Sequence, residues 1–464
     1  MKKRDMSVKE FLATSAAGGI DYADFSRRFM ADVQKANKRY HLLVTLADQP
    51  AQPSPSLYGL PVSAKDCICV EGVQSAAGSR ILEGYRPTFD ATVVARVKKE
   101  GGVAIGKTQQ DEFGFGTFSV NSGYGIPKNP LDPTRSCGGS SGGAAGLVAA
   151  LDQPHVALAE STGGSISAPA AFCGVVGLTP TYGLVSRYGL IDYANSLDKI
   201  GAIGKRVYDV ALLLSVIAGH DSRDSTSLTQ ERRDYTAHTE KRNDLKGVKI
   251  AVPKEYFSHV DKNVEKQVSR AIATLEDLGA ACTTVSLPST KYALAAYYII
   301  ATSEASTNLA RYCGMRYGLH LPLEGNFNEY FAAVRSKGFG DEAKRRIILG
   351  TFARMSGYRK AYYLRAMQVR TVIIQDFKKI FRRYDVIAAP TMPILPPKFS
   401  EIKKLKPLEH YQMDVLTVPA NLAGIPHISV PCKPKTPVGL HVLGDHLAEP
   451  KLIEIAGAFE RAML

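Results

Sequence analysis

The sequence lacks any apolar run long enough to cross a membrane, and its basic N-terminus soon carries acidic residues. We therefore expect neither a spanning helix nor a signal peptide, and a cytoplasmic protein. The seven cysteines are an odd number in a long chain, which does not indicate a disulfide framework. Cys67 and Cys69 lack a second pair or a nearby histidine, so buried thiols explain them better than a zinc site. No metal site is predicted.

Acidic residues are also scarce, since 44 Asp and Glu face 58 Lys and Arg and leave a net charge of +14. The basic residues are dispersed, however, and no RNA-binding module accompanies them. Charge alone therefore does not predict direct recognition of nucleic acid. Internal repeats, low-complexity tracts and a phosphate-binding P-loop are missing too, so nothing in the sequence predicts a nucleotide cofactor.

The segments that are present predict an α/β fold in one large domain, residues 1–464. Apolar stretches typical of buried strands, at 57–70, 103–109 and 155–161, alternate with helical patterns at 90–102 and 142–151. Residues 1–50 are expected to be helical, followed by a Pro/Ser-rich connector at 47–56. Helical patterns dominate residues 290–380, which we interpret as an insertion.

Two glycine- and serine-rich segments stand out, SCGGSSGGAAG at 136–146 and ESTGGSISAP at 160–169. Glycine pairs let the backbone approach a ligand, and successive free amides can hold an anion. The amides of Thr162, Gly163, Gly164 and Ser165 could stabilise a developing oxyanion beside a serine nucleophile. Either segment alone is most simply a flexible turn, but two of them beside buried elements favour a site.

A serine nucleophile needs a base, and no histidine lies in or near these segments. His155 is closest, several residues before Ser165, so a Ser-His-Asp triad finds no local support. Lys65, in GLPVSAKD, follows an apolar strand pattern. Burial there would favour a neutral amine, although most lysines are solvated surface charges. Lys65 is therefore the candidate base.

Together the motifs GLPVSAKD, GKTQQDEFGFG, CGGSSGG, STGGSISAPAAFCGVVGLTPTYGLVSRYG and SLDKIGAIGKRVYDVALLL resemble the amidase-signature family. The resemblance implies a mixed central β-sheet flanked by helices on both faces, with residues 57–205 as the signature core. It also implies a Ser–cis-Ser–Lys triad. In that triad Lys65 is the base, Ser140 the bridging serine after a cis peptide from Gly139, and Ser165 the nucleophile. Ser141 is the rival for the bridging role.

Two positions depart from the family pattern, which usually has Asp where this chain has Ser161 and Arg where it has Ser167. Losing one partner of a buried ion pair costs about 3–5 kcal/mol, whereas losing both is nearly neutral. We therefore expect a coupled replacement that leaves all three triad positions filled.

Within the family, the segments SRYGLIDYANSLDKIG, KGVKIAVPKEYF, GFGDEAKRRIILGTFARMSGY and MDVLTVPANLAGIPHISVPC resemble the A subunits of tRNA-dependent amidotransferases. That resemblance implies glutamine as ammonia donor. Arg346 would then bind the glutamine carboxylate, Asp414 the ammonium, and Tyr297 would line the pocket, to which residues 290–380 contribute. Gln110, with its neighbours Gln109 and Asp111, would flank the substrate.

The same resemblance implies partners. A B subunit would carry ATP and Mg²⁺, a C subunit would wrap the chain, and no cofactor would bind this chain itself. The complex would convert Asp-tRNA(Asn) or Glu-tRNA(Gln) to Asn-tRNA or Gln-tRNA, reaching tRNA through the assembly and with no membrane. Two alternatives stay open: a stand-alone amidase acting on other amides, and a scaffold subunit with impaired catalysis.

Overall fold

The computed structural model describes residues 6–47 and 56–463, and in those residues eleven strands form one sheet. Their order across the sheet is β1 (Leu43–Leu46), β3 (Val103–Thr108), β2 (Pro61–Lys65), β6 (Val156–Ser161), β8 (Lys199–Gly204), β7 (Val176–Thr179), β12 (His427–Pro431), β13 (Gly439–Gly444), β11 (Val386–Pro390), β9 (Lys249–Pro253) and β10 (Ala281–Val285).

The sheet is mixed, as expected. β2 runs parallel to β3 and β6, and β9 runs parallel to β10 and β11, while the other paired strands are antiparallel. Every residue of β2 and of β6 is buried. Parallel strands covered on both faces have near-continuous apolar sequences, which is why the sequence predicts these strands clearly. A separate hairpin pairs β4 (Lys128–Asn129) with β5 (Asp132–Ser136).

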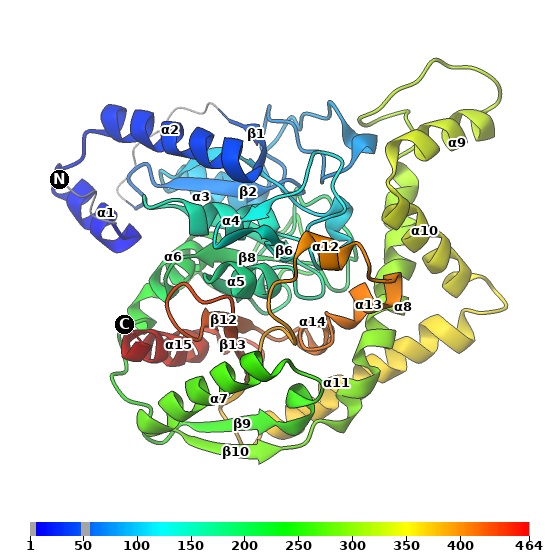
Figure 1. Cartoon of the computed structure of the whole chain (residues 1–464). Coiled ribbons are helices and arrows are strands. Elements are labelled where there is room, and N and C mark those ends of the chain that lie inside the picture. The colour runs from blue at the N-terminus through cyan, green and yellow to red at the C-terminus, as the bar shows by residue number, and fades with distance from the viewer. Residues whose placement is uncertain (1–5, 48–55, 464) are drawn as a thin grey trace.

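Helices flank both faces of the sheet (Figure 1). They are α1 (Val8–Ala16), α2 (Tyr22–Tyr40), α3 (Thr92–Lys99), α4 (Gly142–Ala150), α5 (Ser167–Cys173), α6 (Val207–Ile217), α7 (Lys262–Asp277), α8 (Ala293–Asn308), α9 (Phe327–Gly338), α10 (Asp341–Arg354), α11 (Arg365–Phe381), α12 (Phe399–Ile402), α13 (Pro407–Gln412), α14 (Val418–Ala423) and α15 (Glu449–Met463). Among the described residues, no helix is both long and apolar enough to cross a bilayer.

The N-terminal segment is helical only in part, which corrects the expectation for residues 1–50. α2 ends at Tyr40, and His41 follows in the left-handed region with φ of 56°. Leu43–Leu46 then forms the edge strand β1, antiparallel to β3. Val44 and Thr45 are β-branched and suit a strand, a local preference that the helical interpretation overlooked. Residues 48–55 of the expected connector lie outside the described residues.

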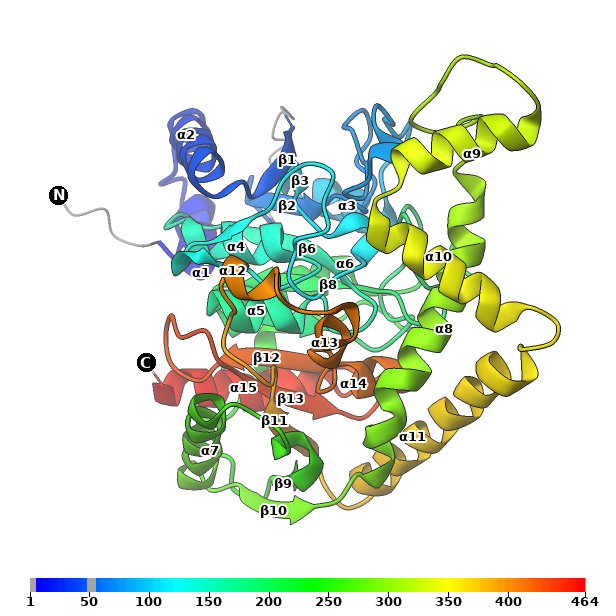
Figure 2. The same ribbon diagram turned by 45° about the vertical axis from the view of Figure 1, so that its right-hand side comes forward.

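Residues 290–380 contain α8, α9, α10 and α11, as the sequence predicted. These helices lie together at the right-hand side of Figures 1 and 2. α8 contacts α10, α11 and α14, so the helical segment is joined both to itself and to the C-terminal part of the core. This arrangement brings side chains of α8 and α10 to the carboxyl-end loops of the sheet.

Candidate active site

Lys65 is the last residue of β2, and its side chain is fully buried. Its Nζ lies 2.6 Å from Ser140 Oγ, 2.8 Å from Glu160 Oε2 and 2.9 Å from the Glu160 carbonyl oxygen. These three acceptors satisfy the three donors of an ammonium group. The sequence prediction that Lys65 meets Ser140 in a buried setting is confirmed by this geometry.

Ser140 follows a cis peptide bond from Gly139, as the family resemblance implied. The neighbouring Ser141 points elsewhere, because its hydroxyl donates to the Glu160 carbonyl at 3.1 Å. Ser140 is therefore the serine that contacts Lys65. Gly139 has no room for a side chain, since an added Cβ would lie 2.3 Å from Asp111 Oδ2.

Ser165 lies in the loop between β6 and α5 and retains 7% exposure. Its carbonyl accepts a hydrogen bond from the Ser141 amide at 3.3 Å, which joins the two serine loops. Within the described part of the chain, the Ser165 hydroxyl and the amides of Gly163, Gly164 and Ser165 make no hydrogen bond. A hydroxyl and three amides thus remain available to a ligand.

The glycines of this loop are required by their surroundings. A Cβ on Gly163 would lie 2.5 Å from the hydroxyl oxygen of Tyr297, and one on Gly164 would lie 2.2 Å from Thr417 Oγ1. Gly164 also has φ of +156°, which side chains rarely adopt. Tyr297, expected as a pocket wall, therefore lies directly on the candidate oxyanion loop.

Glu160 is a residue that sequence analysis noticed but did not use. It is buried at the end of β6, beside the end of the parallel neighbour β2, and forms an ion pair with Lys65. The Thr162 hydroxyl lies 2.7 Å from Glu160 Oε1 and 2.8 Å from Asp198 Oδ1. Burial, with the nearby charge of Glu160, raises the pKa of Asp198 well above its ordinary value. Opposite charges at the ends of neighbouring buried strands were the available signal.

Arg346, on α10, is buried to 3% exposure rather than lying on the helix surface. Its Nε donates to Glu342 Oε1 at 2.8 Å and its Nη1 to the Tyr193 hydroxyl at 2.7 Å. Four aromatic rings surround the guanidinium at 5.0–5.8 Å: Phe115, Tyr193, Tyr298 and Tyr411. Such a cage holds a fixed positive charge in an apolar setting.

Asp414 lies beside this cage. Tyr298 donates to its Oδ2 at 2.6 Å and Thr117 to its Oδ1 at 2.9 Å. Burial raises the pKa of Asp414 to about 6, against the lowering effects of these two hydrogen bonds and of Arg346. Tyr298 adjoins Tyr297, whose ring meets it edge-on at 5.0 Å. The Arg346–Asp414 group and the Ser165 loop are therefore neighbours through these two tyrosines.

The side chain of Gln110 serves the backbone. Its Oε1 accepts from the Cys67 amide at 2.9 Å and its Nε2 donates to the Asp111 carbonyl. Asp111 accepts from the amides of Ser119 and Asn121. These buried groups hold the loop after β3 in place. A substrate contact for Gln110 stays a prediction.

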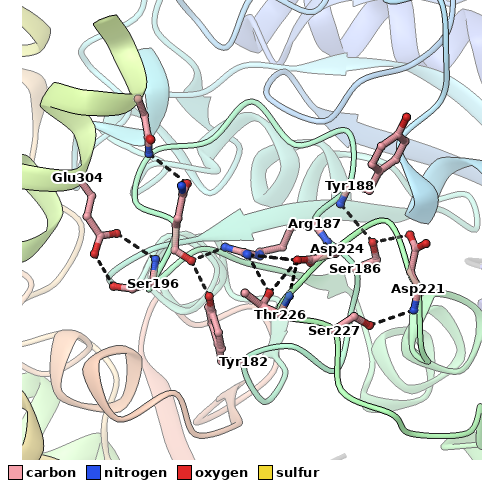
Figure 3. A network of polar contacts seen from close by, with 12 residues as sticks. Tyr182, Ser186, Arg187, Tyr188, Ser196, Asp221, Asp224, Thr226, Ser227 and Glu304 are labelled. Atoms are coloured by element: carbon pink, nitrogen blue, oxygen red, sulfur yellow. Dashed lines mark hydrogen bonds and ion pairs between the residues drawn. The ribbon is translucent and has the colours of Figure 1, made fainter. Parts of the chain in front are cut away.

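The loop before β8 carries Tyr193 and Asp198, and a polar network fixes it (Figure 3). Arg187 pairs with Asp224, and Glu304 on α8 accepts from both the amide and the hydroxyl of Ser196. Neither Tyr193 nor Asp198 was found from sequence, because nothing local distinguishes them from other buried residues. Their partners come from segments far away in the chain.

Residues 25–453 match the amidase family model. The chain belongs to the amidase family. The A subunit of glutamyl-tRNA(Gln) amidotransferase from Halothermothrix orenii is 48% identical over 473 residues, covering 100% of this chain and 98% of that protein. The corresponding protein of Methanococcoides burtonii is 50% identical, covering 87% of this chain and 85% of its own. The crystal structure of the A subunit from Thermotoga maritima superposes with a TM-score of 0.82 at 36% identity, covering 99% of this chain and 95% of that one.

As a member of the amidase family the chain is an amidase by class, and its two departures can now be placed. Ser167 lies 3.0 Å from His427 Nδ1, which in turn lies 3.0 Å from His441 Nε2, all in the buried core. Ser161 Oγ is buried without a hydrogen bond in the described structure. Neither position holds a charge, so no unpaired ion is left there. The described residues contain no cluster of three His, Cys, Asp or Glu suited to a metal.

Proposed function

We propose that this chain is the glutamine-hydrolysing A subunit of a tRNA-dependent amidotransferase. The observation that carries the proposal is the adjacency of two groups: Lys65, Ser140 and Ser165 on one side of Gly163, and Arg346 and Asp414 on the other. Free glutamine presents an amide at one end and a zwitterion at the other. The relatives of 46–50% identity that carry that name support the same substrate.

In the proposed reaction, neutral Lys65 accepts the Ser140 proton while Ser140 accepts the Ser165 proton. Ser165 then attacks the amide carbon of glutamine and forms a tetrahedral oxyanion. The free amides of the Gly163–Ser165 loop stabilise it, an interaction typically worth about 10²–10³ in rate for one donor. The relay protonates the departing ammonia, and water hydrolyses the glutamyl ester to glutamate.

Arg346 and Asp414 position the substrate. The guanidinium offers a planar pair of donors to the α-carboxylate, and the Asp414 carboxylate accepts from the α-ammonium. A neutral aliphatic amide uses neither group, which argues against a stand-alone amidase for such substrates. Tyr297 lies between the two ends and closes the pocket over Gly163.

The proposal includes the assembly. Ammonia has to reach an activated aminoacyl-tRNA, so the chain would act in the cytoplasm with a B subunit that binds ATP and Mg²⁺ and with a C subunit. This chain would bind no cofactor itself. tRNA would be bound through the complex, and the choice between Asp-tRNA and Glu-tRNA would rest with the B subunit.

The test is to trap the acyl position. The chain, assembled with its co-expressed B and C subunits, is treated with a diazoketone analogue of glutamine and digested for mass spectrometry. We expect one adduct on Ser165, none in Ser165→Ala, and protection by glutamine. Labelling without amidation of either mischarged tRNA would favour a stand-alone amidase. An unlabelled but assembled complex would favour the scaffold.

A further inference from the structure

The proposed relay requires a neutral Lys65, yet the structure places a buried carboxylate against it. Glu160 Oε2 lies 2.8 Å from Lys65 Nζ, and both side chains are almost fully shielded from water. An opposite charge at this distance favours the charged form of a lysine, so the pair opposes formation of the base. This contact is separate from the Ser140 contact that the mechanism uses.

Hydrogen-bond accounting shows which carboxyl group carries the negative charge. The Thr162 hydroxyl has a single proton but lies within hydrogen-bond distance of both Glu160 Oε1 and Asp198 Oδ1. It can donate to only one of them, so the other carboxyl group has to donate to Thr162 and must be protonated. Lys65 keeps Glu160 ionised, while Asp198 Oδ2 is occupied by the amides of Tyr193 and Ala194.

Asp198 is therefore the protonated member, and its proton lies on Oδ1. The raised pKa of Asp198, caused by burial and by the charge of Glu160, agrees with this assignment. The result is a directed chain in which Asp198 donates to Thr162, Thr162 donates to Glu160, and Lys65 donates to Glu160 from the other side. One negative charge faces one ammonium group.

We propose that Glu160 is a positioning residue that keeps Lys65 as an ammonium in the resting enzyme and thereby sets the acid limit of amide hydrolysis. The base arises when one proton leaves the Lys65–Glu160 pair to water, after which Lys65 Nζ can accept the Ser140 proton. This inference rests on the proposed Ser–Ser–Lys chemistry, but it does not depend on which amide is the substrate.

Other titratable groups also face the pair. They are Cys67 after β2, Asp111 after β3, and Asp192, Tyr193 and Asp198 in the loop before β8. Burial raises the pKa of Cys67, which keeps the thiol neutral. Asp111 has a pKa raised by burial to about 6 and is the competing source of an acid limit. Only a change at Glu160 alters the charge in contact with Lys65.

The experiment measures kcat/KM against pH, which reports the ionisations of the free enzyme. In Glu160→Gln we expect the acid limb to move down by about one pH unit or more, the shift typical of losing a neighbouring opposite charge. Activity one unit below the wild-type midpoint should then rise about fivefold relative to the plateau. Asp198 can ionise once Glu160 is neutral, so Glu160→Gln/Asp198→Asn should give the full shift.

Two matched controls keep the interpretation specific. Asp198→Asn alone keeps a donor to Thr162 and removes no charge, so its acid limb should coincide with wild type. Glu454→Gln breaks an ion-pair cluster with Lys241 and Arg242 on α15 and should likewise leave the limb unmoved. An active double variant whose limb matches wild type would overturn the inference, and so would an equal shift in Asp198→Asn.

A second measurement applies even where the Glu160 variants fail to fold. Wild-type protein carrying ¹³Cε-labelled lysine is titrated by NMR, and the Lys65 signal is assigned by its loss in Lys65→Arg. We expect the ammonium form at pH 7, whereas a neutral amine at that pH would contradict the inference. Failure of the proposed function is distinguishable, because wild type would then hydrolyse no amide and label no serine.

Discussion

Two buried ion pairs, Lys65–Glu160 at the sheet edge and Arg346–Glu342 on α10, share a length of 2.8 Å and near-complete burial of the cation. Their surroundings differ. Lys65 meets a serine hydroxyl, a carboxylate and a carbonyl, whereas Arg346 is enclosed by four aromatic rings. A lysine can lose its proton when conditions favour it, but an arginine in a protein does not. The first pair suits proton transfer, and the second suits a permanent charge.

The comparison is broken most severely by removing the charge that must be lost. In Lys65→Met the base is absent, and we expect hydrolysis of every amide to fall by about 10³-fold or more, since a general base contributes about 10²–10⁴. The variant also leaves Glu160 buried without its partner, at a cost of about 3–5 kcal/mol. Turnover of glutamine and of a neutral amide is measured in the assembled complex.

The control for folding is Lys65→Met/Glu160→Gln, which removes both charges. Its unfolding free energy should recover most of the loss, while its activity stays as low as that of the single variant. Recovery of activity together with stability would show that Lys65 acts only through the fold.

Changing the permanent charge should affect one substrate class only. In Arg346→Met we expect kcat/KM for glutamine to fall about 10²-fold, because a charge-assisted pair with the α-carboxylate contributes about 3 kcal/mol. Arg346→Lys should recover part of this loss, since it keeps the charge without the planar donors. A neutral aliphatic amide should be hydrolysed by all three proteins alike. Equal losses on both substrates would instead assign Arg346 to the packing of its cage.

These two sites differ in how far sequence could predict them. Lys65, Ser140 and Ser165 lie in short motifs whose strand and loop settings follow from local pattern, so the contact of Lys65 with Ser140 was predictable. The cage around Arg346 draws Phe115, Tyr193, Tyr298 and Tyr411 from four separate segments. No local period identifies such residues, and only tertiary structure brings them together.

Local reasoning failed where two preferences competed. The Leu43–Leu46 segment follows a long amphipathic helix and resembles its continuation, but a left-handed His41 ends the helix and β3 offers a strand partner. Glu160 was visible as the sole acid of its motif, yet its role depends on the register that places β6 beside β2. Strand pairing is a long-range choice that a single segment does not encode.

A milder change sharpens the recognition side through pH. The pKa of Asp414 is raised to about 6, chiefly by burial, so its carboxylate loses its charge as pH falls through that value. We expect KM for glutamine to rise as pH is lowered from 7 to 5, with no such rise for a neutral amide. Asp414→Asn should show a KM about tenfold higher at pH 7 and a flat dependence below it. A neutral amide with the same KM profile would exclude an ammonium contact.

The smallest expected effect concerns Glu342, the counterpart of Glu160. Burial opposes its ionisation, but Arg346 and two hydrogen bonds outweigh burial and leave the pKa of Glu342 below its ordinary 4.5. A carboxyl with a depressed folded-state pKa contributes stability above about pH 4.5, and that contribution is lost as pH falls below it. In Glu342→Gln we expect unfolding to be about 2 kcal/mol easier at pH 7, with less further loss below pH 4.5 than in wild type. The acid limb of kcat/KM should stay where it is, because Arg346 carries its charge with or without this carboxylate. Denaturant unfolding at several pH values, run beside the kinetic profile, checks both parts. A limb that moved as far as in Glu160→Gln would mean that the two pairs are not different in kind.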